Sequence, residues 1–161
     1  MKRKTVLVTG GLGFIGSNLL IHLIKLNYFV IILDKKTYSS NLMNLQNIDK
    51  NKYKLFISDI NNKSQIFKIL KKYKPVAIFN LAAETHVDRS IDNPEKFIKS
   101  NVNGVLVLLE QLRKYTKQNH NVKFLHVSTD EVYGDIPKRK TSLETDSYQP
   151  SSPYAASKAS A

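Results

Sequence analysis

A tyrosine and a lysine one helical turn apart are the residues of this chain best suited to acid–base chemistry. Tyr154 and Lys158 stand at positions i and i+4 of a predicted helix, so their side chains share one helix face. An ammonium group beside a phenol favours the phenolate, and we expect Lys158 to lower the pKa of Tyr154 from about 10 toward neutrality. Such a phenol can take a proton from an alcohol while a hydride leaves the same carbon.

A hydroxyl and two adjacent carboxyl groups follow a β-rich apolar run that ends at Val127. Thr129, Asp130 and Glu131 would then lie at the C-terminal end of a strand. If their environments push the two carboxyl pKa values apart, one group can act as an acid and the other as a base. The alternative is that Asp130 and Glu131 are two solvated loop charges, as most Asp-Glu pairs are.

The first predicted strand runs into a glycine-rich turn. Gly11, Gly13 and Gly16 satisfy the pattern G-x-G-x-x-G, and Gly10, Gly13 and Gly16 satisfy G-x-x-G-x-x-G. Without side chains in this turn, a pyrophosphate can approach the backbone and the N-terminal dipole of the next helix. Asp34, at the end of the second predicted strand, is placed to accept hydrogen bonds from a ribose and to repel a 2′-phosphate, which favours NAD over NADP. The alternative is a glycine turn used only for tight packing.

Short β-branched runs alternate with amphipathic ones along the whole chain, which predicts an α/β fold with a doubly wound parallel sheet of the Rossmann type. The sequence predicts strands over 5–9, 29–33, 54–57, 76–80 and 122–127. It predicts helices over 14–26, 63–72 and 94–115, a loop over 137–150, and a final helix from Pro153. In the third helix, Phe97, Ile98, Val102, Val105, Leu106, Leu109 and Leu112 are expected to form one apolar stripe. Asn93 and Ser152 precede prolines and are the expected N-caps.

Composition limits the function classes. The chain has 161 residues, 42% of them hydrophobic, and a formal net charge of +12. It lacks the run of about 18 apolar residues that crosses a membrane, and Met1 to Lys4 lead into a strand rather than into a signal peptide. We therefore expect a cytoplasmic protein. There is no cysteine, and the four histidines lack ligand spacing, so no metal site is expected. The basic residues are scattered, so nucleic acid is not the expected partner.

With these motifs, nearly the whole chain resembles the extended short-chain dehydrogenase/reductase family, and within it the nucleotide-sugar 4,6-dehydratases that act on dTDP-glucose or UDP-glucose. The resemblance rests on residues 9–16, 34–38, 59–60, 81–90, 128–134 and 150–158. The Asp-Glu pair after Thr129 is its most specific part, because related epimerases lack it. Thr85 stands where the family usually has Ser.

The resemblance implies a set of site residues. The implied catalytic residues are Thr129, Asp130, Glu131, Tyr154 and Lys158, and Thr85 and Thr129 would contact the substrate. The implied cofactor-binding residues are Gly10, Gly13, Phe14, Ile15, Gly16, Asp34, Lys35, Lys36, Thr37, Asp59, Ile60, Leu81, Ala82, Ala83, Glu84, Thr85, Ser100, Tyr154 and Lys158. In the implied mechanism, Tyr154 takes the sugar O4 proton, Glu131 the C5 proton, and Asp130 protonates the departing C6 hydroxyl.

The expected function is therefore NAD-dependent dehydration of a nucleoside-diphosphate glucose to the 4-keto-6-deoxy sugar. Two alternatives stay open: a nucleotide-sugar 4-epimerase and a catalytically silent NAD-binding module. We expect residues 1–161 to be one NAD-binding domain that ends inside the helix of Tyr154 and Lys158, with the substrate domain absent. The resemblance implies a homodimer for the full-length protein and an inactive fragment. It leaves open whether the nucleotide is dTDP or UDP.

Overall fold

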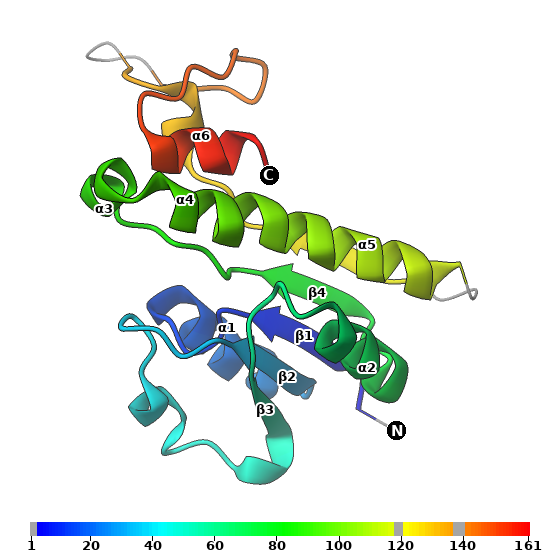
Figure 1. The fold of residues 1–161 in the computed structure, drawn as a ribbon. Helices are drawn as coiled ribbons and strands as arrows, with labels where there is room; N and C mark the ends of the chain where they lie inside the picture. Colours follow the sequence, from blue (N-terminus) through cyan, green and yellow to red (C-terminus); the bar gives the residue numbers. More distant parts are fainter. Residues whose placement is uncertain (1–2, 118–120, 137–140) are drawn as a thin grey trace. The chain divides into compact units, whose positions relative to one another are not determined.

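The computed structural model of the chain describes residues 3–117, 121–136 and 141–161. These residues form two compact units (Figure 1): Met1–Ala82 with Val107–Val127, and Ala83–Leu106 with Ser128–Ala161. The first unit contains the sheet and the glycine turn, and the second contains Tyr154 and Lys158. Of the predicted loop, residues 141–150 contain no helix or strand, and residues 137–140 lie outside the described residues.

A five-stranded sheet, parallel throughout, is the framework of the first unit. Its strands are β1 (Thr5–Thr9), β2 (Phe29–Asp34), β3 (Tyr53–Ile57), β4 (Ala77–Asn80) and β5 (Lys123–His126). They lie in the order β3-β2-β1-β4-β5. Each bound lies within one residue of its prediction, because short runs rich in β-branched, aromatic and other apolar residues, bounded by polar residues, mark strands clearly. The connections turn in opposite directions from β1, so the carboxyl ends of β1 and β4 form the switch point where such sheets bind ligands.

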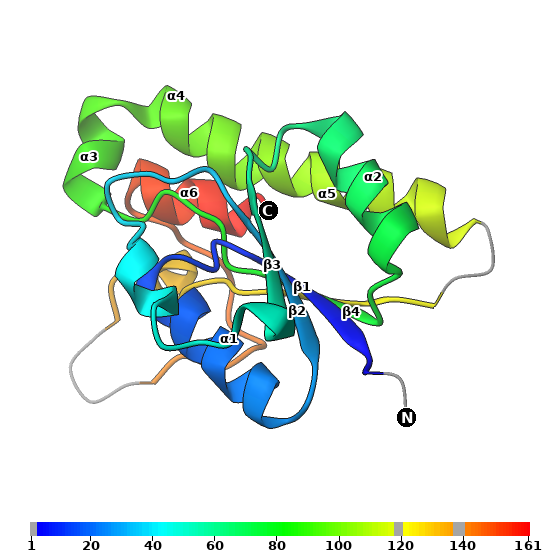
Figure 2. The same cartoon turned by 90° about the horizontal axis from the view of Figure 1, so that it is seen from below.

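Helices cover both faces of this sheet, as Figure 2 shows. Helix α1 (Phe14–Lys25) lies on one face, and α2 (Lys63–Tyr73) and residues 107–116 of α5 (Gly104–Thr116) lie on the other. Successive strand residues point to opposite faces. Leu7, Ile31, Leu33 and Ile78 contact α2 and α5, whereas Val6, Val8, Val30 and Ile32 belong to the core beneath α1. Full burial stabilises each such side chain by about 1.5–3 kcal/mol. The predicted doubly wound Rossmann fold is confirmed.

The predicted helix over 94–115 contains a change of helical phase. It consists of α4 (Pro94–Phe97), a π-helical segment η3 (Ile98–Asn103) and α5. A π turn holds more residues than an α turn, so it rotates the residues that follow. After the π-helical segment, Leu106 and Leu109 are 58% and 42% exposed, while Val107 and Leu108 are buried; Ile98, at its start, is 45% exposed. The prediction of one continuous apolar stripe was therefore wrong.

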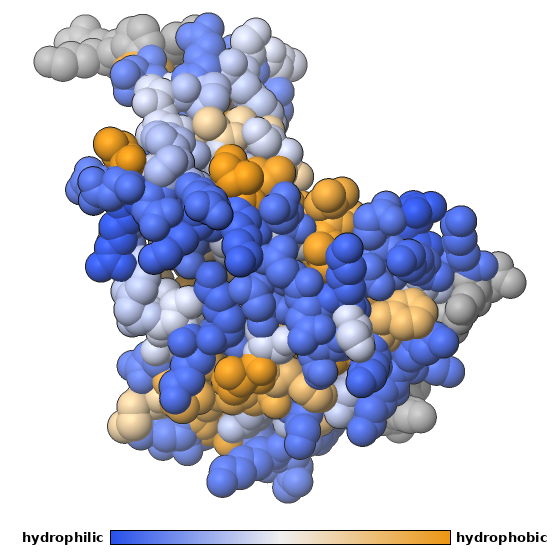
Figure 3. All heavy atoms as spheres, in the orientation of Figure 1, coloured by the Kyte–Doolittle hydropathy of each residue, from blue (hydrophilic) through white to orange (hydrophobic). Residues whose placement is uncertain are grey.

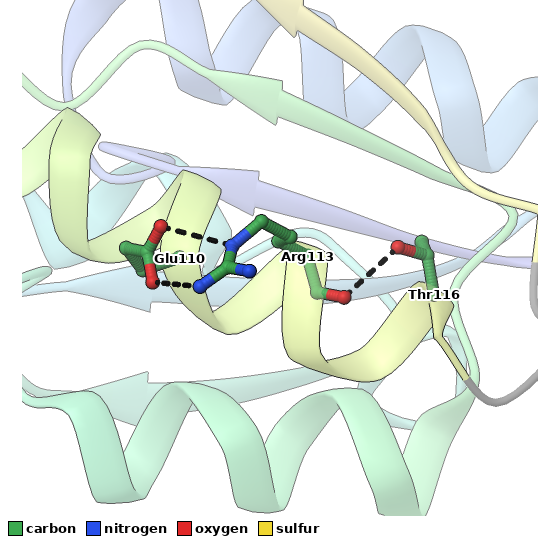
Figure 4. A network of polar contacts seen from close by, with 3 residues as sticks. All are labelled: Glu110, Arg113 and Thr116. Atoms are coloured by element: carbon green, nitrogen blue, oxygen red, sulfur yellow. Dashed lines mark hydrogen bonds and ion pairs between the residues drawn. The ribbon is translucent and has the colours of Figure 1, made fainter.

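The outer side of α5 carries an ion pair. Arg113 donates through Nε and Nη2 to the two carboxylate oxygens of Glu110, at 3.1 and 2.8 Å (Figure 4). Thr116 donates to the carbonyl of Arg113 at 3.2 Å. The pair lies in solvent, and such pairs contribute little to stability. The face shown in Figure 3 is mostly hydrophilic, with small hydrophobic areas between the charged side chains.

Several short elements have no counterpart in the predictions. They are α3 (Val87–Asp92), the 3₁₀ turns η1 (Leu42–Leu45) and η2 (Lys50–Lys52), and the 3₁₀ turn η4 (Asp130–Tyr133). Elements this short show too few repeats of a helical pattern to be recognised. The predicted last helix is α6 (Pro153–Ala159). Its predicted N-cap is confirmed, since Ser152 Oγ accepts from the Ala155 N–H at 3.0 Å, and Asn93 Oδ1 caps α4 in the same way.

Within 3–117, 121–136 and 141–161, no helix is long and apolar enough to span a bilayer. In the same ranges, no three His, Asp or Glu side chains gather as metal ligands would.

Candidate active site

The glycine turn brings the chain close to the segment that follows β4. A Cβ atom at Gly10, whose φ is +67°, would lie 2.8 Å from the Ala82 nitrogen, and one at Gly16 would lie 2.2 Å from the Gly10 oxygen. Neither position accepts a side chain without displacing backbone. At Gly13 an added Cβ would meet only the Gly10 oxygen, at an ordinary 3.4 Å. Gly10 and Gly16 are thus required for packing, whereas Gly13 leaves an open backbone surface.

The N-terminus of α1 is suited to an anion. Gly13 is its N-cap and supplies no side-chain acceptor, and the first turn holds no acidic residue. The first-turn N–H groups therefore keep their donor capacity and their positive dipole end for a bound phosphate. Phe14 and Ile15, the first two residues of the helix, are 83% and 62% exposed. This cradle fits the pyrophosphate of a dinucleotide.

Asp34 connects the end of β2 to the glycine turn and is only 6% exposed. Its Oδ2 accepts from the Leu12 N–H at 3.0 Å, and its Oδ1 accepts from the Lys36 N–H and the Ser40 hydroxyl, each at 2.8 Å. A carboxylate offers about four acceptor positions. Three are used by these protein donors, so one position on Oδ2 remains for a ribose hydroxyl.

Five further predicted cofactor residues of the first unit follow the strands β2 and β3. Lys35, Lys36 and Thr37 follow Asp34, with both lysines exposed. Asp59 Oδ1 accepts from the backbone and side-chain N–H groups of Asn61, at 2.8 and 2.9 Å, next to the buried Ile60.

A polar chain across the carboxyl ends of three strands was not predicted. Thr9 Oγ1 donates to Asn80 Oδ1 at 2.5 Å, and Asn80 Nδ2 lies 2.9 Å from His126 Nδ1. Thr9 Oγ1 also accepts from the Ala82 N–H at 3.3 Å. The chain fixes the strand ends beside Gly10, and with them the backbone of Leu81 and Ala82. The position of Asn80 and His126 at strand ends could have revealed it.

The remaining predicted cofactor residues lie in the second unit. Asn101 binds the backbone of Glu84 on both sides: its Oδ1 accepts from the Glu84 N–H at 2.8 Å, and its Nδ2 donates to the Glu84 carbonyl at 3.0 Å. Ser100, from the same π-helical segment, is buried, whereas Thr85 is exposed. Asn101, which was not predicted, therefore sets the course of residues 83–85.

The predicted acid–base residues after β5 form a capped turn. Thr129 is the N-cap of η4, and its hydroxyl accepts from the Glu131 N–H at 3.4 Å and donates to Asp130 Oδ1 at 3.3 Å. Both carboxyl side chains are exposed, while the next residue, Val132, is buried. Burial of Val132 and the cap together hold the two carboxyl groups on the open side of the turn.

Tyr154 is buried within the second unit, 8% exposed, and its ring lies edge-on to Phe97 with centroids 6.3 Å apart. Burial raises the pKa of its phenol above 10; a side-chain hydrogen bond with Thr129 lowers it, and the charges of Glu131 and Asp130 raise it. The prediction that the phenol of this chain is tuned toward neutrality was therefore wrong, because desolvation of the phenolate outweighs the favourable contact. The η4 turn, with Thr129, Asp130 and Glu131, packs against the helix that carries Tyr154.

Lys158 is buried one turn further along α6, 6% exposed. Burial lowers the pKa of its ammonium from 10.5 to about 8, because a charged amine loses hydration there. At neutral pH it still carries its charge for most of the time, as a partner for a phenolate requires.

The second unit thus contains all five predicted catalytic residues: Thr129, Asp130 and Glu131 at the η4 turn, and Tyr154 and Lys158 on α6, which packs against that turn. The first unit brings together the glycine turn and Asp34, with Asp59 near the end of the neighbouring strand. The two groups belong to different units and are described separately.

Fold and site together define a Rossmann-type dinucleotide-binding protein with a Tyr-x-x-x-Lys helix. The family model of GDP-mannose 4,6 dehydratase matches residues 7–161, so the chain belongs to that family.

Curated relatives and solved structures agree with this membership. The dTDP-glucose 4,6-dehydratase of Salmonella typhimurium is 44% identical over 171 residues, covering 96% of this chain and 47% of the relative. A dTDP-glucose 4,6-dehydratase of Streptomyces venezuelae, solved with NAD and TYD bound, is 38% identical with a TM-score of 0.86, covering 97% of this chain and 48% of that one. The UDP-glucose 4-epimerase of Thermus thermophilus, in complex with NAD, is 33% identical with a TM-score of 0.85, covering 96% and 47%. The chain spans about half the length of the curated relatives it matches.

Proposed function

We propose that the protein that carries this chain is a NAD-dependent hydro-lyase that converts a nucleoside-diphosphate glucose to its 4-keto-6-deoxy product. Membership of the dehydratase family and 44% identity to a dTDP-glucose 4,6-dehydratase support this reaction class. The observation that carries the proposal is the capped η4 turn, in which Thr129 holds the exposed Asp130 and Glu131, packed next to the α6 helix that carries Tyr154 and Lys158. A hydroxyl, a phenol and two carboxyl groups in one cluster are what an oxidation coupled to an elimination requires.

Each residue of the cluster has a task in this reaction. Tyr154 takes the proton of the sugar O4, and Thr129 holds that oxygen by a hydrogen bond. Once C4 is a ketone, the C5 proton is acidic, and Glu131 removes it. Asp130 gives a proton to the departing C6 hydroxyl. The elimination thus uses one carboxyl group as a base and the other as an acid, which adjacent residues can be if their environments differ.

NAD is the cofactor that the first unit fits best. The N-terminus of α1, which has no side-chain cap, would hold the pyrophosphate. The remaining acceptor position of Asp34 would bind the adenosine ribose, and Asp59 would bind the adenine. A bound NAD would accept the C4 hydride and give it back at C6, and Glu131 would return a proton to C5, so that the sugar loses only water and the reaction has no net redox change. The family resemblance assigns residues 81–85, Ser100 and Lys158 to the nicotinamide half of the cofactor, and these roles stay predictions.

A 4-epimerase is the second candidate, because the Thermus thermophilus epimerase has nearly the same fold over this length. An epimerase would use Tyr154 and Lys158 in the same way but would leave Asp130 and Glu131 without a task. The capped η4 turn, which holds both carboxyl groups beside Tyr154, favours the dehydratase.

A product assay tests the proposal. The product of the complete gene, loaded with NAD, would be incubated with dTDP-glucose, UDP-glucose and GDP-mannose side by side. We expect a 4-keto sugar with a C6 methyl group from one of them. A C4 epimer without the methyl group would identify an epimerase. Tyr154→Phe is the control, because it keeps the ring against Phe97 and removes only the reacting hydroxyl.

We further propose that residues 1–161 alone bind NAD without catalytic turnover. The glycine turn and Asp34 lie in this chain, while relatives are about twice as long. Calorimetry with NAD and a dehydratase assay on the 161-residue chain test both statements. The homodimer, the cytoplasmic location and the choice between dTDP and UDP stay predictions from the sequence.

A further inference from the structure

Helix α6 is held from outside at the residue that carries the reacting phenol. A side chain takes its direction from the backbone that carries it, and Tyr154 lies in the first turn of α6. The orientation of the Tyr154 side chain therefore depends on what fixes the backbone of the first turn.

Every N–H group in the first turn of α6 has an acceptor. Pro153 has no N–H, the Ala155 N–H is capped by Ser152 Oγ at 3.0 Å, and the Ala156 N–H binds the Ser152 carbonyl at 2.8 Å. The Tyr154 N–H donates instead to Ser90 Oγ, at 3.0 Å, on a residue 64 positions earlier in the chain. Three of the first-turn positions thus follow ordinary capping, and Tyr154 alone is bound by another element.

The surroundings of Ser90 orient its hydroxyl oxygen as an acceptor for the Tyr154 N–H. It lies in α3 and is 0% exposed, and its hydroxyl donates to the Val87 carbonyl at 2.6 Å. Because that donation fixes the direction of the O–H bond, a lone pair of the same oxygen is available to the Tyr154 N–H. A buried serine whose hydrogen is already committed acts as an oriented acceptor.

The carbonyl of Tyr154 is bound by a second serine hydroxyl. Ser157 Oγ donates to it at 2.7 Å and accepts from Asn101 Nδ2 at 2.9 Å. Asn101 is 1% exposed and also holds both backbone groups of Glu84. Both backbone polar groups of Tyr154 are thus fixed by serines, each tied to a different helical segment.

We propose that Ser90 is a positioning residue for Tyr154: its hydroxyl, by binding the Tyr154 N–H, fixes the first turn of α6 and with it the direction of the phenol. The inference rests on the proposed function for its catalytic meaning. Loss of the hydroxyl leaves a buried N–H without its protein acceptor, and the first turn of α6 must shift to reach another. A misplacement of about 1 Å can cost a rate up to roughly a hundred-fold.

The test compares Ser90→Ala with Ser152→Ala in the product of the complete gene, loaded with NAD. Each variant removes one acceptor from the first turn of the same helix, so both should lower the thermal midpoint. We expect Ser90→Ala to lower kcat by about ten-fold to a hundred-fold with little change in KM, and Ser152→Ala to keep most of kcat. Equal kcat losses in the two variants, or an unchanged kcat in Ser90→Ala, would overturn the proposal.

A second measurement does not depend on turnover. Tyrosine labelled with ¹³C on the ring reports the surroundings of the phenol, and Tyr154→Phe identifies the signal of Tyr154 among those of the other tyrosines. The signal of Tyr154 should move in Ser90→Ala and stay in place in Ser152→Ala. If Ser90→Ala does not fold, Ser90→Cys takes its place, since it keeps the shape with a weaker acceptor. An unmoved signal overturns the positioning role even where the dehydratase assay succeeds, and a moved signal supports it even where that assay fails.

Discussion

The backbone N–H of Leu12 donates a hydrogen bond of 3.0 Å to Oδ2 of Asp34, so the glycine turn and the acid at the end of β2 are one connected structure. The carboxylate that is placed to select the ribose also holds the turn that is placed to receive the pyrophosphate. A change at Asp34 should therefore alter cofactor choice and local stability together.

Replacement of Asp34 by Asn should narrow or reverse the preference for NAD over NADP. The change removes the charge that repels a 2′-phosphate, and the exposed Lys35 and Lys36 could then attract one. Stability should fall by roughly 1–3 kcal/mol, since an amide cannot accept all three hydrogen bonds. Dissociation constants for both cofactors measure the first effect. Ser40→Ala is the matched control: it removes one bond to Asp34 without its charge and should leave the ratio unchanged.

Gly13→Ala should weaken NAD binding, whereas Gly16→Ala should lower the stability of the fold. A methyl group at Gly13 meets only the Gly10 oxygen at 3.4 Å, so the variant should fold normally and bind NAD more weakly, because the methyl group covers the open backbone. At Gly16 a methyl group would lie 2.2 Å from the same oxygen, so that variant should lose stability. Thermal unfolding and NAD titration separate the two effects. Normal NAD affinity in Gly13→Ala would place the pyrophosphate elsewhere.

Glu131→Gln and Asp130→Asn should stop the reaction at different steps. Without the base, C4 oxidation remains possible but exchange of the C5 proton with deuterated solvent should cease. Without the acid, C5 exchange should continue while loss of the C6 hydroxyl slows. Losses of roughly 10²- to 10⁴-fold are the usual scale for such groups. Each variant serves as the control for the other. If Glu131→Gln exchanged the C5 proton at the wild-type rate, Asp130 and Glu131 would be only two solvated loop charges.

Lys158 should make stability depend on pH in the alkaline range. Its pKa is about 8 in the folded protein and 10.5 ordinarily, so between these values the unfolded chain binds more protons than the folded one. Its contribution to stability should therefore rise as pH rises from 8 to 10.5, where the buried amine becomes neutral. Lys158→Met should lack this rise and lose catalytic activity. The thermal midpoints of both proteins would be measured at several pH values in that window. At each pH, subtracting the midpoint of Lys158→Met from that of the wild-type protein cancels the effect of the other titrating groups. Parallel curves would show that Lys158 keeps its ordinary pKa.

Local sequence determined the sheet and the motifs. The central strands β1 and β2 are nearly continuous apolar runs, and this pattern indicates burial between two helical layers. Ser152 and Asn93 cap the helices that follow them because capping needs only neighbouring residues. The glycine turn and the spacing of Tyr154 and Lys158 are equally local, and relatives with the same family signature confirm the family.

Tertiary structure alone decided the phase of the helix over 94–116 and the environment of the phenol. The π-helical segment places Asn101 against Glu84 and Ser157, a contact with residues 17 and 56 positions away that no local pattern encodes. Tyr154 and Lys158 were expected to tune one another, but burial sets the direction of both pKa shifts, and burial depends on what folds over them. The bond from Tyr154 to Ser90 likewise exists only because two distant segments meet. Spacing along a chain fixes which groups share a helix face, whereas desolvation and hydrogen-bond partners depend on the packed whole.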